Sequence, residues 1–224
     1  QPHATIIMAS NDTRTANLAR MMQLESYDYV IVCTGDEKTA EYWQQRLTSM
    51  DGQVFSGSRI LAVHEARWSG GAGNGFGTLH AYENACRKCH ELYGEDLTAR
   101  LRGGASVSLY HTAGKGTRLA PLPGSECNNK PGVQLPGVLR QQDLYVNISI
   151  LEAVIKQTGV YAKSRRGRLS VFWGDQIFIP SADASYIPTH EVDIMCTLRE
   201  MPSAATWAAE GLDKYGLIAV NAEG

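Results

Sequence analysis

The sequence predicts an α/β fold in which a mixed, mostly parallel sheet is covered by helices. Three observations indicate this fold. Short apolar runs rich in β-branched residues recur along the chain, segments with helical spacing separate them, and turns containing glycine follow several of the runs. Such alternation is typical of parallel strands joined by crossover helices. The chain has 224 residues, 43% of them hydrophobic, so it can bury one sizeable core. We therefore expect a single domain over residues 1–224.

The elements follow in order along the chain. Five strands are expected, at residues 27–33, 59–63, 107–111, 169–173 and 192–198. Helices are expected over residues 37–47, from Thr78 to about Leu92, and through residues 148–155. Asp36 is placed to cap the first of these helices. A loop rich in Pro, Gly and Asn is expected over residues 121–137. The last residues, 215–224, resemble a strand that enters a turn, so we expect the chain to be truncated at its C-terminus.

Composition excludes several classes of function. The net charge of −2 provides no basic field for nucleic acid or an anionic membrane, so neither is expected as a partner. No apolar run approaches the roughly 18 to 20 residues needed to cross a bilayer. The first residues lack the layout of a signal peptide. Four of the five cysteines lie in predicted strands or helices, which favours reduced thiols and a cytoplasmic location.

The segment that follows the strand at residues 107–111 is the most informative. Glycines at the carboxyl end of a strand leave backbone N–H groups accessible to a phosphate. Arg118 adds a planar fork that suits phosphate oxygens, and Lys130 lies across the following loop as a second cation. The segment is not a Walker A loop, and a tight turn beside a surface arginine is the alternative. The residues assigned to phosphate binding are Gly114, Lys115, Gly116, Thr117 and Arg118.

Gly174 and Asp175 follow the strand at residues 169–173. A carboxylate at this edge is suited to Mg²⁺, a hard cation that prefers oxygen ligands. An ordinary turn is the alternative, because Gly-Asp after a strand is common. The phosphate-binding segment in the same sheet favours Asp175 as a metal ligand.

A glycine cluster over residues 70–77 lies between a strand and a helix, but no Gly-x-Gly-x-x-Gly register fits it. This excludes a dinucleotide fingerprint. Glycines at a helix N-terminus can still cradle a phosphate or let a base lie against the backbone, and a flexible loop is the alternative. The residues assigned to nucleotide binding here are Gly73, Asn74, Gly75, Gly77 and Thr78. The haem-like pattern Cys-x-x-Cys-His at residues 86–90 falls within a predicted helix, and we interpret it as coincidence.

At residues 114–122, with Lys130-Pro131 and residues 172–175, the chain resembles the sugar nucleotidyltransferase superfamily. The resemblance covers residues 27–224 and implies a Rossmann-like α/β/α sandwich of the nucleotide-diphospho-sugar transferase type. It implies that the glycines, Thr117 and Arg118 wrap the NTP phosphates, that Lys130 contacts the phosphates or the sugar phosphate, and that Asp175 binds Mg²⁺. The second metal-binding Asp of that family is not matched here.

The order of elements resembles the fucose-1-phosphate guanylyltransferase branch, because the glycine cluster precedes the phosphate segment. The stricter Gly-Thr-Arg-Leu form of that segment departs from the branch and leaves sugar and base open. The implied activity joins an NTP, with GTP or UTP favoured, to a sugar-1-phosphate and releases pyrophosphate. One alternative is a transferase acting on a non-sugar phosphate. The other is a regulatory module that binds a nucleotide or nucleotide sugar without catalysis. Further domains of the same polypeptide are possible partners.

Overall fold

The computed structural model describes residues 11–65, 73–113, 125–141, 143–177, 179–196 and 200–214. The chain divides into two compact units. One consists of residues 9–187, and the other of residues 1–8 together with 188–224. Within the second unit, a short helix α6 (Ala204–Glu210) precedes the 3₁₀ turn η5 (Leu212–Lys214). None of the helices in the described part of the chain has the length and apolar character needed to cross a membrane.

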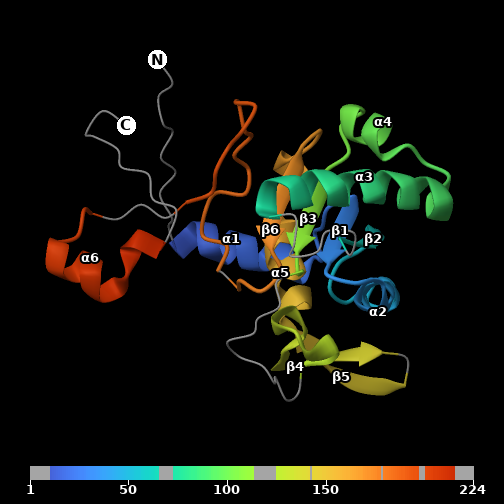
Figure 1. Cartoon of the computed structure of the whole chain (residues 1–224), viewed down its shortest axis with the longest axis horizontal. Coiled ribbons are helices and arrows are strands. Elements are labelled where there is room, and N and C mark those ends of the chain that lie inside the picture. The colour runs from blue at the N-terminus through green and yellow to red at the C-terminus, as the bar shows by residue number, and fades with distance from the viewer. Residues whose placement is uncertain are drawn as a thin grey trace. The chain divides into compact units, whose positions relative to one another are not determined.

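The larger unit contains a parallel sheet of four strands in the order β2-β1-β3-β6 (Figure 1). The strands are β1 (Tyr29–Thr34), β2 (Arg59–His64), β3 (Val107–His111) and β6 (Leu169–Trp173). Four of the five predicted strands are therefore confirmed. All six residues of β1 are buried, as expected for a central strand that is covered on both faces.

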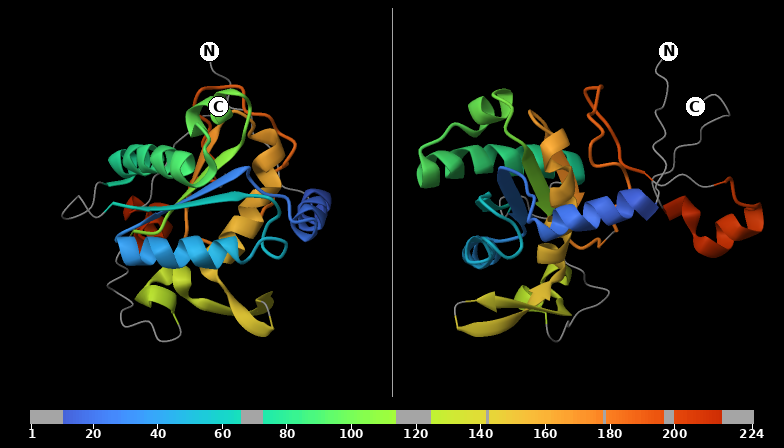
Figure 2. Two further views of the ribbon diagram at one scale, coloured as in Figure 1. Left: turned by 90° about the vertical axis from the view of Figure 1, so that its right-hand side faces the viewer. Right: turned by 180° about the vertical axis from the view of Figure 1, so that it is seen from behind.

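Helices cover both faces of this sheet, and Figure 2 shows α2 and α3 on opposite sides of the strands. Val30 and Val32 of β1 face α2 (Glu37–Thr48) and α5 (Ile150–Thr158). Tyr29 and Ile31 face α3 (Gly73–Tyr93) and α4 (Leu97–Arg102). Successive side chains of a strand point to opposite faces, so one apolar run supplies both halves of the core. Each large side chain buried in this way contributes about 1.5–3 kcal/mol.

The crossover connection from β1 to β2 and the one from β3 to β6 have opposite handedness. The chain steps from β1 to β2 toward one edge of the sheet and from β3 to β6 toward the other edge. The helices α2 and α5 in these two connections nevertheless pack in the same core cluster, on the same face. Parallel crossovers are right-handed in about 98% of cases, so one of the two has the rare hand.

The predicted helices are present, with shifted ends. Asp36 caps α2, with its Oδ1 accepting a hydrogen bond from the Thr39 N–H at 2.8 Å, as predicted. Helix α3 begins at Gly73 rather than Thr78. Helix α5 begins at Ile150, after a capping box in which Ser149 and Glu152 exchange hydrogen bonds.

Besides the short helices α4 and α6, two larger elements were not predicted. The first is α1 (Asn11–Met22), whose buried Asn17 donates to the carbonyl oxygens of Pro180 and Ala182 at 2.9 and 2.8 Å. The second is an antiparallel hairpin formed by β4 (Gln134–Gln141) and β5 (Leu144–Ser149), which lies on the α2 side of the sheet (Figures 1 and 2). The hairpin begins within the loop predicted over residues 121–137. That loop also contains the 3₁₀ turns η2 (Glu126–Asn128) and η3 (Lys130–Gly132).

The strand predicted at residues 192–198 is wrong for its described part. Residues 192–196 have no regular structure, and Val192 is 76% exposed. An apolar β-branched run forms a strand where a partner strand lies beside it and its side chains can pack against a surface. In the described part of the chain, residues 192–196 pair with no strand and are exposed. The strand-like segment at residues 215–224 lies outside the described residues.

Candidate functional site

The candidate site lies at the carboxyl edge of the parallel sheet. The strand order reverses between β1 and β3, and ligands of open α/β sheets bind outside the carboxyl ends of the strands at such a point. Thr112, the first residue after β3, donates from both its N–H and its Oγ1 to the Cys33 carbonyl oxygen at 2.8 Å. The predicted phosphate-binding residues follow almost at once. Gly114, Lys115, Gly116, Thr117 and Arg118 all lie outside the described residues.

Two of the predicted site residues are brought together at this edge. The Nζ of Lys130, at the start of η3, lies 3.3 Å from the Oδ2 of Asp175, which follows β6. The two residues are 45 positions apart in the sequence. Their side chains are 35% and 28% exposed, so both are partly open to solvent. The predicted phosphate-binding cation and the predicted metal ligand therefore form an ion pair.

A glycine at position 174 allows the chain before Asp175 to lie close to β3. A Cβ at this position would come within 2.7 Å of Thr112 Cγ2 and 3.0 Å of Leu151 Cδ1. The Gly174 N–H donates to the His111 carbonyl oxygen at 2.9 Å, which extends the β3–β6 pairing past the last strand residue. Only glycine allows the backbone before Asp175 to approach β3 and α5 in this way.

Gly132 has the corresponding role for Lys130, because a Cβ there would collide with the Glu126 carbonyl oxygen. Asn129 adds a link to the sheet, since its Nδ2 donates to the Thr112 carbonyl oxygen at 3.2 Å. The Oδ1 of Asn129 is buried and has no hydrogen-bond partner among the described residues. The sequence reasoning missed Asn129, although its place immediately before the assigned Lys130 was a usable signal.

The described part of the glycine cluster, residues 73–77, forms the first turns of α3. Gly73 has a φ of +70°, and a Cβ at Gly75 would meet only open space. A Cβ at Gly77 would lie 3.1 Å from Glu65 Oε2 and 3.5 Å from His111 Cε1. Gly77 therefore serves close packing of the helix against the ends of β2 and β3. The Asn74 side chain lies outside the description.

Thr78 contacts a residue at the end of β3, which the sequence reasoning also missed. Its Oγ1 lies 2.8 Å from the Nε2 of His111, so a hydrogen bond joins α3 to the strand that precedes the predicted phosphate-binding residues. Burial lowers the pKa of His111, which keeps the imidazole neutral near pH 7.

Glu65, after β2, is a further titratable group at this edge. Burial raises its pKa, and the nearby His80 opposes that shift. The Cys33 thiol donates to Glu65 Oε2 at 3.9 Å, and burial together with this carboxylate raises the pKa of Cys33 to about 12. A thiol with such a pKa stays protonated at neutral pH, so Cys33 is not a nucleophile.

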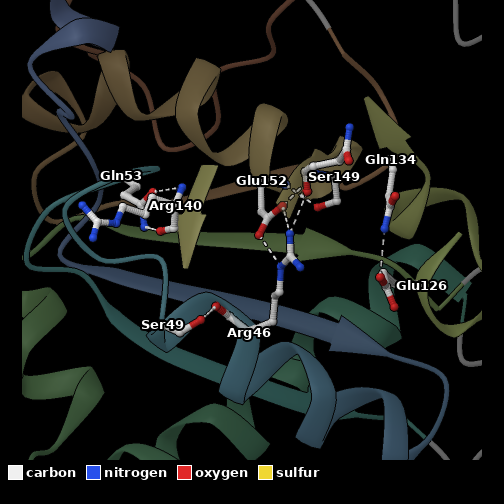
Figure 3. A network of polar contacts seen from close by, with 9 residues as sticks. Arg46, Ser49, Gln53, Glu126, Gln134, Arg140, Ser149 and Glu152 are labelled. Carbon is white, nitrogen blue, oxygen red and sulfur yellow. Dashed lines mark hydrogen bonds and ion pairs between the residues drawn. The ribbon is translucent and has the colours of Figure 1, made fainter. Parts of the chain in front are cut away.

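A buried ion pair fastens the hairpin and α5 to α2 (Figure 3). Glu152 is fully buried, and its two oxygens lie 2.7 and 3.0 Å from the Nε and Nη2 of Arg46. The Arg46 Nη2 also donates to the Asn147 carbonyl oxygen at 2.9 Å. Gln53 holds the other strand, because its side-chain amide donates to and accepts from the backbone of Arg140. These contacts hold the hairpin, and the turn that carries Lys130 leads directly into β4.

The described residues contain no group of three or more His, Cys, Asp or Glu side chains arranged to hold a metal ion. All five cysteines are free thiols. Of the Cys-x-x-Cys-His pattern, Cys89 is buried in the core between α3 and the sheet. Among the described residues, a cation at Asp175 would therefore meet a single carboxylate, and it would need further ligands from water, phosphates or other residues.

Searches of protein-family models, of curated proteins and of solved structures found no significant match to this chain.

Proposed function

We propose that the chain is a nucleotidyltransferase that joins an NTP, GTP or UTP, to a sugar-1-phosphate, giving an NDP-sugar and pyrophosphate. The proposal includes a Rossmann-like α/β/α sandwich as the scaffold. The observation that carries it is the meeting of Lys130 and Asp175, 3.3 Å apart, at the carboxyl edge of the sheet. A cation for phosphate and a carboxylate for Mg²⁺ are the pair of groups that a metal-bound triphosphate requires.

The proposed reaction is an in-line displacement. A sugar-phosphate oxygen attacks the α-phosphorus of the NTP, a new P–O bond forms, and the bond to the β-phosphate breaks so that pyrophosphate leaves. Positioning and charge neutralisation account for catalysis of this kind, so no side-chain nucleophile is needed. Cys33 at this edge stays protonated because its pKa is raised, and a reaction of this kind does not need it as a nucleophile.

Three residues have proposed roles. Arg118 neutralises the leaving pyrophosphate, and Lys130 neutralises charge on the α-phosphate or the sugar phosphate. Asp175 holds Mg²⁺, and its partly exposed carboxylate fits a cation that takes one or two carboxylates together with phosphate oxygens. When bound, Mg²⁺ supplies additional neutralisation of the phosphate charge. Gly174 and Gly132 fix the backbone positions of Asp175 and Lys130.

A thermal-shift panel of ATP, GTP, UTP, CTP and dTTP with Mg²⁺ tests nucleotide binding. A ligand at about 100 times its Kd adds roughly 2.7 kcal/mol to native-state stability, which shifts the melting midpoint visibly. We expect one nucleotide to stand out. A flat panel on the full chain would contradict the proposed site.

Pyrophosphate release with the selected nucleotide and a series of sugar-1-phosphates then tests catalysis. We expect Arg118→Ala to lower turnover by a factor of roughly 10² or more, as for loss of one preorganised electrostatic contact. A variant within threefold of wild type would remove Arg118 from the mechanism. Release with non-sugar phosphates only would identify the related transferase class.

Nucleotide binding without pyrophosphate release would instead identify a regulatory module. The observation that favours this alternative is that Asp175 belongs to no larger cluster of metal-ligating side chains among the described residues.

A further inference from the structure

The Lys130–Asp175 ion pair affects how a cation and a phosphate can bind at this edge. The Nζ of Lys130 and the Oδ2 of Asp175 lie 3.3 Å apart, so each group is the partner that would have to give way to the other's proposed ligand. A phosphate that binds Lys130 competes with Asp175. A cation that binds Asp175 competes with Lys130.

We propose that this ion pair is an internal competitor that couples cation binding to anion binding. A divalent cation at Asp175 releases Lys130 for a phosphate, and a phosphate at Lys130 releases Asp175 for the cation. This inference rests on the proposed function of the same edge. Linkage requires the coupling to be reciprocal, so each ligand tightens the other by the same factor.

The surrounding structure allows the exchange without movement of the main chain. Gly174 packs against Thr112 and Leu151, which fixes the backbone that carries Asp175. Gly132 packs against the Glu126 backbone, which fixes the turn that carries Lys130. Only the two side chains have to turn, and the lysine stem is flexible.

The size of the effect follows from exposure. The two side chains are 35% and 28% exposed, so solvent screens their attraction. Ion pairs of this kind contribute little free energy. Removing one partner should therefore lower the dissociation constant of the other partner's ligand by roughly two- to fivefold.

Two uncharged variants of similar shape, Lys130→Met and Asp175→Asn, test the proposal on the full chain. Electron paramagnetic resonance measures Mn²⁺ binding without nucleotide. Titration calorimetry in the presence of a chelator measures inorganic tripolyphosphate binding. We expect Lys130→Met to tighten Mn²⁺ roughly two- to fivefold, and Asp175→Asn to tighten tripolyphosphate by a similar factor.

A double variant separates competition from a general field effect. If Asp175 only repels phosphate, Asp175→Asn tightens tripolyphosphate equally well when Lys130 is already methionine. If Asp175 competes for Lys130, the gain disappears in that background. Lys163→Met is the matched control, because Lys163 forms an ion pair with Glu25 away from this edge, and both affinities should stay unchanged.

Unchanged or weaker Mn²⁺ binding in Lys130→Met overturns the inference, as does a tripolyphosphate gain that persists in the double variant. In both cases ligand binding by the wild-type chain still supports the proposed function. Absence of binding of both ligands by the wild-type chain overturns the inference and the proposed function together.

Discussion

Replacing Gly174 by alanine tests whether the close approach of β6 to β3 sets the position of Asp175. The added Cβ would meet Thr112 Cγ2 at 2.7 Å and Leu151 Cδ1 at 3.0 Å. The threonine methyl cannot rotate away freely, because Thr112 Oγ1 donates to the Cys33 carbonyl oxygen at 2.8 Å. Overpacking of this kind costs about 1–3 kcal/mol. For a chain of this length we expect the melting temperature to fall by roughly 2–12 °C.

Thermal melting followed by circular dichroism measures the effect. Gly75→Ala is the matched control, because its Cβ would meet open space in a helix, where alanine is favoured over glycine by up to about 1 kcal/mol. Thr112→Ser removes the clashing methyl but keeps the hydroxyl, so it should restore part of the stability lost in Gly174→Ala. A Gly174→Ala protein as stable as wild type, or one that Thr112→Ser fails to rescue, would refute the packing argument.

Three further predictions concern buried groups. Glu152→Gln should destabilise the fold by about 3–5 kcal/mol in urea unfolding, because it leaves the Arg46 charge without its buried partner; equal stability of variant and wild type would show that the pair is not needed. Because burial lowers the folded-state pKa of His111, the unfolded chain binds a proton first, so stability should fall as the pH drops through about 6.5, and less so in His111→Asn; identical pH profiles would contradict this. At pH 8 a thiol reagent should modify the exposed Cys127 and Cys196 but leave Cys33 unmodified until denaturant is added; rapid labelling of Cys33, identified by mass spectrometry, would contradict its burial.

The strands were predictable where both faces are buried. The run at residues 29–34 is apolar except for Thr34 and lies inside the sheet, so pattern and environment agree. The run at residues 192–196 has a similar composition but is exposed, because composition does not reveal whether a partner strand exists. The hairpin was missed because Pro136 and Gly137 indicated a loop. They lie within the register shift between residues 134 and 138, where a strand tolerates such residues.

For the candidate site, the sequence indicated single residues but not how they are arranged. Lys130 and Asp175 stood out by their neighbours in the sequence, whereas their contact depends on the tight packing of Gly132 and Gly174. The buried Arg46–Glu152 pair gave no signal, because charged residues on predicted helices are usually solvated. The opposite hands of the two crossovers also escaped prediction, since α/β sequence patterns carry no information on which face a helix takes.

The attachment of the hairpin leaves unusual freedom to its own sequence. Arg46 donates a hydrogen bond to the carbonyl oxygen of Asn147, and the Gln53 side chain bonds to the backbone N–H and carbonyl oxygen of Arg140. In the hairpin, both residues therefore contact main-chain atoms. Val138, Leu144 and Tyr145 are more than half exposed. Substitutions at these three positions should therefore leave the hydrogen bonds that hold the hairpin intact. The outer face of the hairpin is therefore the surface on which this sequence can change at little cost in stability.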